Sequence, residues 1–152
     1  VAVLFGHNDA APVHDEIGDR HARDELGAGV HVLRDPTRGG VASALNEIAA
    51  SAGVGIRLEE AAIPLEEQVR GACEILGFDP LYVANEGKCI AIVAAEAAER
   101  ALGLMRGDPL GEKAAIIGEV VDEHAGRVYL RSRVGGMRVV DMLSGEQLPR
   151  IC

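Results

Sequence analysis

Two short segments of this 152-residue sequence carry residue types that could do chemistry, and the first is the turn Asp35-Pro-Thr-Arg-Gly-Gly40. Apolar residues recur from Val41 at the spacing i, i+4, i+7 and i+11, which predicts that an amphipathic helix starts at this turn. The unpaired N–H groups and the dipole of a helix start attract anions such as phosphate, and the two glycines would allow a close approach. The alternative is a helix start that Pro36 and Thr37 cap, with the glycines needed for packing.

A comparison of free energies limits the anion interpretation. A helix N-terminus contributes about 0.3–1 kcal/mol to a bound anion, and about 2 kcal/mol in favourable geometry. Micromolar binding requires about 8 kcal/mol. The turn alone therefore cannot hold a nucleotide, and its spacing and lack of a lysine differ from those of a Walker loop.

The second segment is Asn85-Glu-Gly-Lys88, which lies in the turn before an apolar strand pattern. A carboxylate at that place can project beside the edge of a sheet and act as a general base, which would be the role of Glu86. The alternative is that Glu86 is a solvated loop residue, and that Lys88 either pairs with it or faces solvent.

The histidines invite a metal interpretation. His7, His14 and His21 are spaced by seven residues with carboxylates between them. Pro12 and Gly18 interrupt the helix that would align these side chains, and a metal site needs geometry that composition does not supply. The sequence therefore predicts no metal site.

The three cysteines form no C-x-x-C pair, which indicates a reducing compartment and a cytoplasmic location. Cys73 and Cys89 lie in apolar patterns and are expected to pack as small hydrophobic residues. Cys152 is different, because it ends an unpatterned tail, residues 144–152, in which Pro149 prevents a continuing helix. We expect this tail to be mobile and its terminal thiol to be exposed.

Strand and helix patterns alternate along the chain and position these segments. Strands are predicted at 1–5, 30–33, 55–59, 89–93, 115–121, 127–131 and 137–141, and helices at about 20–26, 41–52, 64–76 and 95–105. The strand 89–93 is apolar throughout, as expected of a strand covered on both faces. In the helix 64–76 the stripe Leu65, Val69, Ala72 and Leu76 is expected to face the core.

The last three strands are predicted to form an antiparallel meander, and the whole pattern an α+β or three-layer domain with one mixed sheet. The domain is expected over residues 30–143, preceded by a strand and polar linker at 1–29 and followed by the tail.

Composition excludes several classes of protein. The net charge is −9, and the chain has no Trp, two Tyr and two Phe, which argues against nucleic acid as a partner. No apolar run of 18 residues is present, which argues against a membrane span. Because the chain opens at Val1 directly in a strand pattern, we expect it to be a piece of a longer protein.

Taken together, these motifs resemble the C-terminal half of the HypE family of hydrogenase maturation proteins, within the AIR synthetase-like (PurM-like) superfamily. The resemblance covers about residues 30–152. The matching pieces are Asp35-Pro-Thr-Arg-Gly-Gly-Val-Ala42, Leu45-Asn-Glu47, Ile63-Pro64, Arg70-Gly-Ala-Cys-Glu74, Gly77-Phe-Asp-Pro-Leu-Tyr-Val-Ala-Asn-Glu-Gly-Lys88, Ala115-Ile-Ile-Gly118 and Gln147-Leu-Pro-Arg-Ile-Cys152.

The resemblance implies a fold and a reaction. The fold would be a three-layer α/β/α domain with a mixed, largely antiparallel sheet, as in the C-terminal domain of PurM. In the family, the carbamoyltransferase HypF places a carbamoyl group on the terminal cysteine. HypE then dehydrates this thiocarboxamide to a thiocyanate with ATP, and the cyanide reaches the iron of [NiFe] hydrogenase through the HypC–HypD complex.

By the same resemblance, Cys152 matches the modified thiol and Glu86 the proton acceptor, while Pro149 and Arg150 would position the tail. The turn would line the substrate and phosphate cleft. Its matching residues there are Asp35, Thr37, Arg38, Gly39 and Gly40, together with Asn85. The family's N-terminal half, which carries most contacts to ATP and Mg²⁺ and the homodimer surface, has no counterpart in this sequence. We therefore expect the chain to fold without hydrolysing ATP.

Two other functions stay open. The domain could be a non-catalytic carrier or docking module that the carbamoyltransferase recognises. It could also belong to an ATP-dependent ligase or kinase of the superfamily that acts on a small molecule, in which case Cys152 would be incidental.

Overall fold

The computed structural model describes residues 2–7 and 27–142 and contains one seven-stranded sheet in the order β2-β4-β1-β5-β3-β6-β7. The strands are β1 (Ala2–His7), β2 (Val30–Arg34), β3 (Gly55–Glu59), β4 (Lys88–Val93), β5 (Ala115–Val121), β6 (Val128–Arg131) and β7 (Met137–Val140). The α-helices described are α2 (Gly40–Ala52), α3 (Glu67–Leu76) and α4 (Ala98–Gly107). The helix expected at 20–26 lies outside the described residues.

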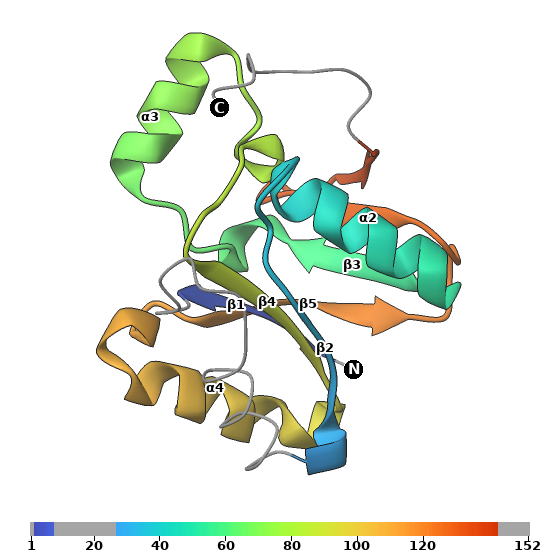
Figure 1. Ribbon diagram of the computed structural model, residues 1–152. Helices are drawn as coiled ribbons and strands as arrows, with labels where there is room; N and C mark the ends of the chain where they lie inside the picture. The colour runs from blue at the N-terminus through green and yellow to red at the C-terminus, as the bar shows by residue number, and fades with distance from the viewer. Residues whose placement is uncertain (1, 8–26, 143–152) are drawn as a thin grey trace.

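Helices cover the two faces of the sheet, as Figure 1 shows, and strand β4 demonstrates why. Ile90 and Ile92 point to the cluster that contains Leu45 of α2. The alternate residues Ala91 and Val93 point to the cluster formed with α4. This alternation confirms that the strand is covered on both faces and that the domain is a three-layer α+β structure.

The sheet is largely antiparallel, but the predicted meander is wrong. Strand β3 lies between β5 and β6, pairing antiparallel with β5 and parallel with β6. The connection from β5 to β6 passes the start of β3, where Gly126 N donates a hydrogen bond to Val54 O (2.9 Å). Gly55 makes room for this crossing, because a Cβ there would collide with the carbonyl oxygen of Glu123. The hairpin of β6 and β7 is confirmed.

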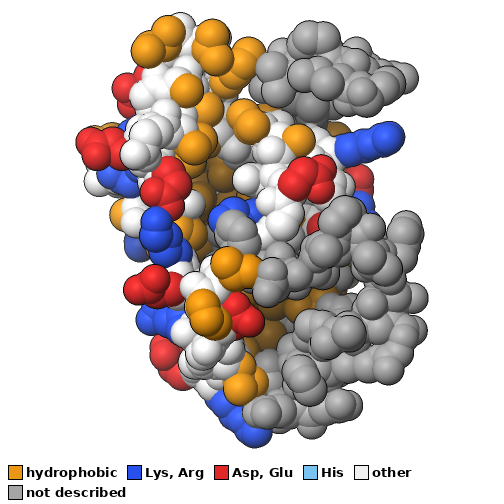
Figure 2. Space-filling model, turned by 60° about the vertical axis from the view of Figure 1, so that its left-hand side comes forward, with side chains coloured by type: hydrophobic (Ala, Val, Ile, Leu, Met, Phe, Trp, Pro, Cys, Tyr) orange, Lys and Arg blue, Asp and Glu red, His pale blue; other side chains and the backbone are white. Residues whose placement is uncertain are grey.

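Helix α3 corrects a second prediction. It begins at Glu67, three residues after Pro64, and Cys73 is its buried residue. Val69 is 43% exposed, Leu76 62% and Ile75 87%, so the expected apolar stripe does not face the core. The helix stands away from the sheet in Figure 1, and Figure 2 shows hydrophobic side chains at the surface of that end of the molecule.

Candidate functional site

The glycine-rich turn connects β2 to α2 as expected, but its cap differs from the prediction. Helix α2 starts at Gly40, and its N-cap is Gly39 in the left-handed conformation (φ 67°), with no side-chain hydrogen bond to the cap. Pro36 and Thr37 therefore do not cap the helix. Pro36 is buried, whereas the side chains of Asp35 and Arg38 are exposed and Thr37 is half-buried.

Gly40 confirms the packing role of the glycines. Its φ is 62°, and a Cβ at this position would collide with the carbonyl oxygen of Leu81 and lie 2.5 Å from that of Val83. Only glycine accommodates both this backbone conformation and this approach. The start of α2 is thereby packed against the segment that contains the 3₁₀ helix η3 (Pro80–Tyr82).

The structure brings the two chemically interesting segments together. Asn85 N donates a hydrogen bond to Pro36 O (3.1 Å), which joins the turn to the Asn-Glu-Gly segment. Glu86 follows with an exposed side chain, and Gly87 turns the backbone into β4 with φ 64°. The residue before Glu86 is thus bonded to the turn that carries Asp35, Thr37 and Arg38, and an exposed carboxylate is chemically able to accept a proton.

Lys88 is half-buried at the start of β4. Partial burial lowers the pKa of Lys88, and the carboxylate of Glu66 opposes this shift. Glu66 itself forms an ion pair with Lys113. The hydrogen bond to Lys113 lowers the pKa of Glu66, and the same bond raises the pKa of Lys113. The surroundings of Lys88 therefore include charges from the two loops that precede α3 and β5.

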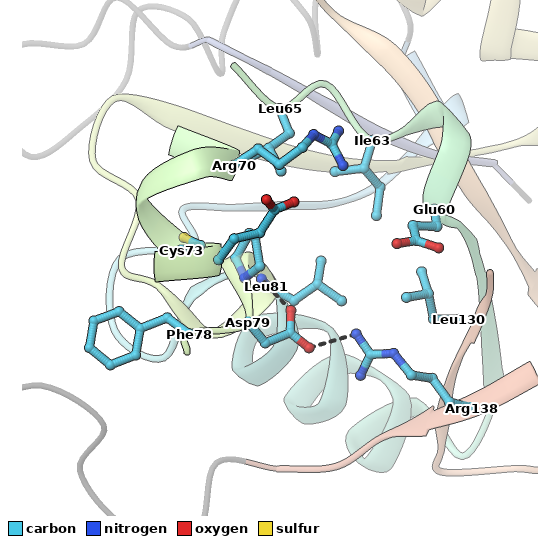
Figure 3. Close-up of a pocket in the computed structure, with 12 residues that line it drawn as sticks. Glu60, Ile63, Leu65, Arg70, Cys73, Phe78, Asp79, Leu81, Leu130 and Arg138 are labelled. Atoms are coloured by element: carbon cyan, nitrogen blue, oxygen red, sulfur yellow. Dashed lines mark hydrogen bonds and ion pairs between the residues drawn. The ribbon is translucent and has the colours of Figure 1, made fainter. Parts of the chain in front are cut away.

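A cavity of about 180 Å³ lies on the other side of η3, between α3 and the β6–β7 hairpin. Asp79 and Arg138 form an ion pair there (2.6 Å), and Figure 3 shows Arg70 and Glu60 on other sides of the opening. Leu81 and Leu130 are among the apolar lining residues. None of the predicted site residues lines this cavity. Its volume is below the roughly 300–1,000 Å³ of typical small-molecule pockets.

Two polar side chains that sequence reasoning missed hold the end of β7. Asn46 Nδ2 donates to Ala42 O and to Val140 O, both at 2.8 Å. Tyr82 Oη donates to Asp141 O (2.9 Å). Burial raises the pKa of Tyr82. Both residues lie in stretches that match the family. That match was the only feature of the sequence that could have marked them as candidates.

Several predicted residues lie outside the described residues, namely Pro149, Arg150, Cys152, His14 and His21. Cys73 is buried as expected, and Cys89 is half-buried. Within residues 2–7 and 27–142, no three His, Cys, Asp or Glu side chains come together as metal ligands. In the same part of the chain, no helix is both long and apolar enough to cross a membrane.

Comparison with known proteins places this geometry in a family. The carbamoyl dehydratase HypE of Cupriavidus necator is 57% identical over 145 residues, covering 95% of this chain and 40% of the relative. A crystal structure of HypE in complex with ATP matches 99% of this chain and 52% of its own, with a TM-score of 0.82 and 40% identity. A crystal structure of a HypE–HypF complex matches 92% of this chain and 52% of its own, with a TM-score of 0.79 and 37% identity.

The chain therefore spans about half the length of these proteins or less. A family model, that of the C-terminal domain of AIR synthase related proteins, matches residues 10–131. The fold agrees with that domain in its layers and in its mixed sheet. This chain belongs to the AIR synthase related protein family and comprises its C-terminal domain.

Proposed function

We propose that this chain is the C-terminal domain of a hydrogenase maturation factor that carries a carbamoyl group on Cys152. The full-length protein would dehydrate that group to a thiocyanate and so supply cyanide for the iron of a hydrogenase. The similarity to proteins named carbamoyl dehydratase HypE supports this proposal, because it extends over 95% of the chain. This similarity favours the proposal over the superfamily alternative, a ligase or kinase that acts on a small molecule.

The chemistry requires an activated oxygen and a base. The oxygen of a thiocarboxamide is a poor leaving group, and ATP supplies the phosphoryl group that converts it into phosphate. As the C–O bond breaks, the nitrogen gives up its protons and the C≡N bond forms. We assign the acceptance of a nitrogen proton to Glu86. Asp35, Thr37, Arg38 and the glycines of the turn would face the substrate and the phosphates.

The observation that carries the proposal is the hydrogen bond from Asn85 N to Pro36 O. It joins the candidate base to the candidate phosphate-facing turn in a chain whose relatives are named for this reaction. Asn85 would line the same cleft. Pro149 and Arg150 would then position Cys152 within it.

ATP binding is a property of the related structure. Among the residues that the structure describes, no three carboxylate, His or Cys side chains come together as metal ligands. On the family resemblance, we assign Mg²⁺ and most nucleotide contacts to the N-terminal half of a full-length protein, and no step of the proposal passes through the metal.

The proposed partners follow from the same relatives. The HypE–HypF complex supports a carbamoyltransferase of the HypF type as the donor to Cys152. We further propose the HypC–HypD complex as the acceptor and a homodimer for the full-length protein. The complex also favours a second candidate, in which this domain serves the transferase as a carrier or docking module without catalysing the dehydration.

The experiment incubates this chain with a carbamoyltransferase, carbamoyl phosphate and ATP. Its C-terminal peptide is then analysed by mass spectrometry, with Cys152→Ala as the control. A carbamoyl group on Cys152 that is absent from the control supports the carrier role. No modification of the full-length protein, with a transferase active on a related HypE, would overturn it. In full-length protein, Glu86→Gln should keep the carbamoyl group and stop thiocyanate formation. Unchanged dehydration in this variant would remove Glu86 as the proton acceptor, whereas a full-length protein that takes up the carbamoyl group but forms no thiocyanate would leave only the carrier function.

A further inference from the structure

Strand β7 is the last described element before the C-terminal segment 143–152, and it stands at the edge of the sheet. Among the described residues, its backbone pairs with β6 only. Met137 and Val139 are 53% and 39% exposed, so little apolar burial holds this strand beyond Val140. An edge strand of four residues with few buried side chains is prone to fraying, unless other groups hold its end.

Side chains from two other elements bind the end of β7. Asn46 of α2 donates to Val140 O, and Tyr82 of η3 donates to Asp141 O. Arg138 of β7 pairs with Asp79, whose other carboxylate oxygen accepts from Leu81 N (3.0 Å) at the start of η3. The final residues of β7 are thus fixed to α2 and η3 by polar contacts that do not depend on the sheet.

The same two elements build the candidate site. Helix α2 begins at the glycine-rich turn, and η3 packs against Gly40 at that turn. Asn85, which bonds to Pro36 O, follows η3 by a few residues. The point where the C-terminal segment starts is therefore fixed in relation to the turn and to the loop that carries Glu86.

We propose that Asn46 and Tyr82 are positioning residues that fix the starting point of the C-terminal segment, so that the thiol of Cys152 reaches the site at a high effective concentration. This inference rests on the proposed function. Residues 143–152 can span at most about 33–36 Å when extended. For a segment of that length, the probability that its end reaches the site depends on the position of its starting point. If the starting point is less firmly held, that probability falls.

The effects of a substitution on the two chemical steps distinguish a loss of positioning of the C-terminal segment from a loss of protein stability. In the proposed function, carbamoylation of Cys152 is a reaction between two proteins, the transferase and this one. We further propose that dehydration is intramolecular, so that the modified thiol must reach the site of the protein that carries it. A less firmly held starting point of the segment should therefore slow the dehydration and leave the carbamoylation unchanged.

The experiment uses full-length protein with Tyr82→Phe and with the double change Asn46→Ala, Tyr82→Phe. Tyr129→Phe is the matched control, because it removes the hydroxyl of the other tyrosine, whose described contact is the ring of His124. Carbamoylation is followed by mass spectrometry, and thiocyanate formation by single-turnover kinetics at saturating ATP. Thermal unfolding reports whether each variant remains folded.

We expect the double variant to form thiocyanate about three- to tenfold more slowly, with carbamoylation within about twofold of the unchanged protein. The control should match the unchanged protein in both steps. Unchanged dehydration in the double variant would overturn the positioning role, and so would an equal slowing of both steps in a less stable protein. If the unchanged protein takes up no carbamoyl group on Cys152, the proposed function fails, and the positioning role fails with it.

Discussion

At the scale of single residues, Gly40 couples the turn to the rest of the site. Its left-handed backbone (φ 62°) would cost an alanine about 1–2 kcal/mol, and the collision with the carbonyl of Leu81 would add about 1–3 kcal/mol. We therefore expect Gly40→Ala to lower the free energy of unfolding by about 2–5 kcal/mol, measured by urea denaturation.

Gly53→Ala is the matched control for this change. Gly53 ends the same helix with φ 67°, but no atom lies within 4 Å of a Cβ placed there. Its substitution should cost the backbone strain alone, about 1–2 kcal/mol. The effect of an alanine on the unfolded chain is the same at both positions and cancels in the comparison. Equal losses for the two variants would show that the packing of Gly40 against Leu81 is unimportant.

The sequence predicted some residues of the site and missed others, for physical reasons. Gly39 and Gly40 could be identified because a glycine pair before a helix pattern indicates either a left-handed backbone or a close approach of another group. The bond from Asn85 N to Pro36 O was not, because backbone groups far apart in the chain carry no sequence signal. Tyr82 and Asn46 bond to carbonyl oxygens, which every residue possesses, so their partners were also invisible.

At the scale of elements, α3 shows where amphipathic patterning misleads. The stripe that includes Val69 and Leu76 predicts a face packed on the core, yet the helix is held through Cys73 and its neighbours beside η3. Periodicity indicates that one face is apolar, but it cannot say whether this domain buries that face. The same limit applies to strand order, since the pattern of β6 is equally compatible with β5 or β3 as its neighbour.

Substitution of Ile75 tests this description of α3. The side chain is 87% exposed, so Ile75→Gln should change the free energy of unfolding by no more than about 0.5 kcal/mol. Leu45→Ala is the contrasting change, since Leu45 is fully buried on α2 and its truncation should cost about 2–5 kcal/mol. Urea denaturation of both variants measures the difference. A loss above 1 kcal/mol for Ile75→Gln, where about 0.5 is the surface limit, would show that the Ile75 side chain is buried in solution.

At the scale of the whole molecule, strand β1 explains how the chain forms a complete sheet. It lies between β4 and β5, and it pairs with β4 from Ala2 to His7 and with β5 from Ala2 to Phe5. Val3 is fully buried in the main core. The first residues are thus central to the sheet, and together with α2 and α4 they close a core on each face. We expect this domain to fold as one unit even without the remainder of a full-length relative.

Folding and nucleotide binding should therefore be separable. The described residues offer a helix start worth at most about 2 kcal/mol to a phosphate, where micromolar affinity needs about 8 kcal/mol. We expect isothermal titration of this chain with ATP and Mg²⁺ to show no micromolar binding, and its ATPase activity to be absent. A full-length relative serves as the positive control. Micromolar binding to the isolated chain would contradict the assignment of the nucleotide contacts to the N-terminal half and would place a complete ATP site within this domain.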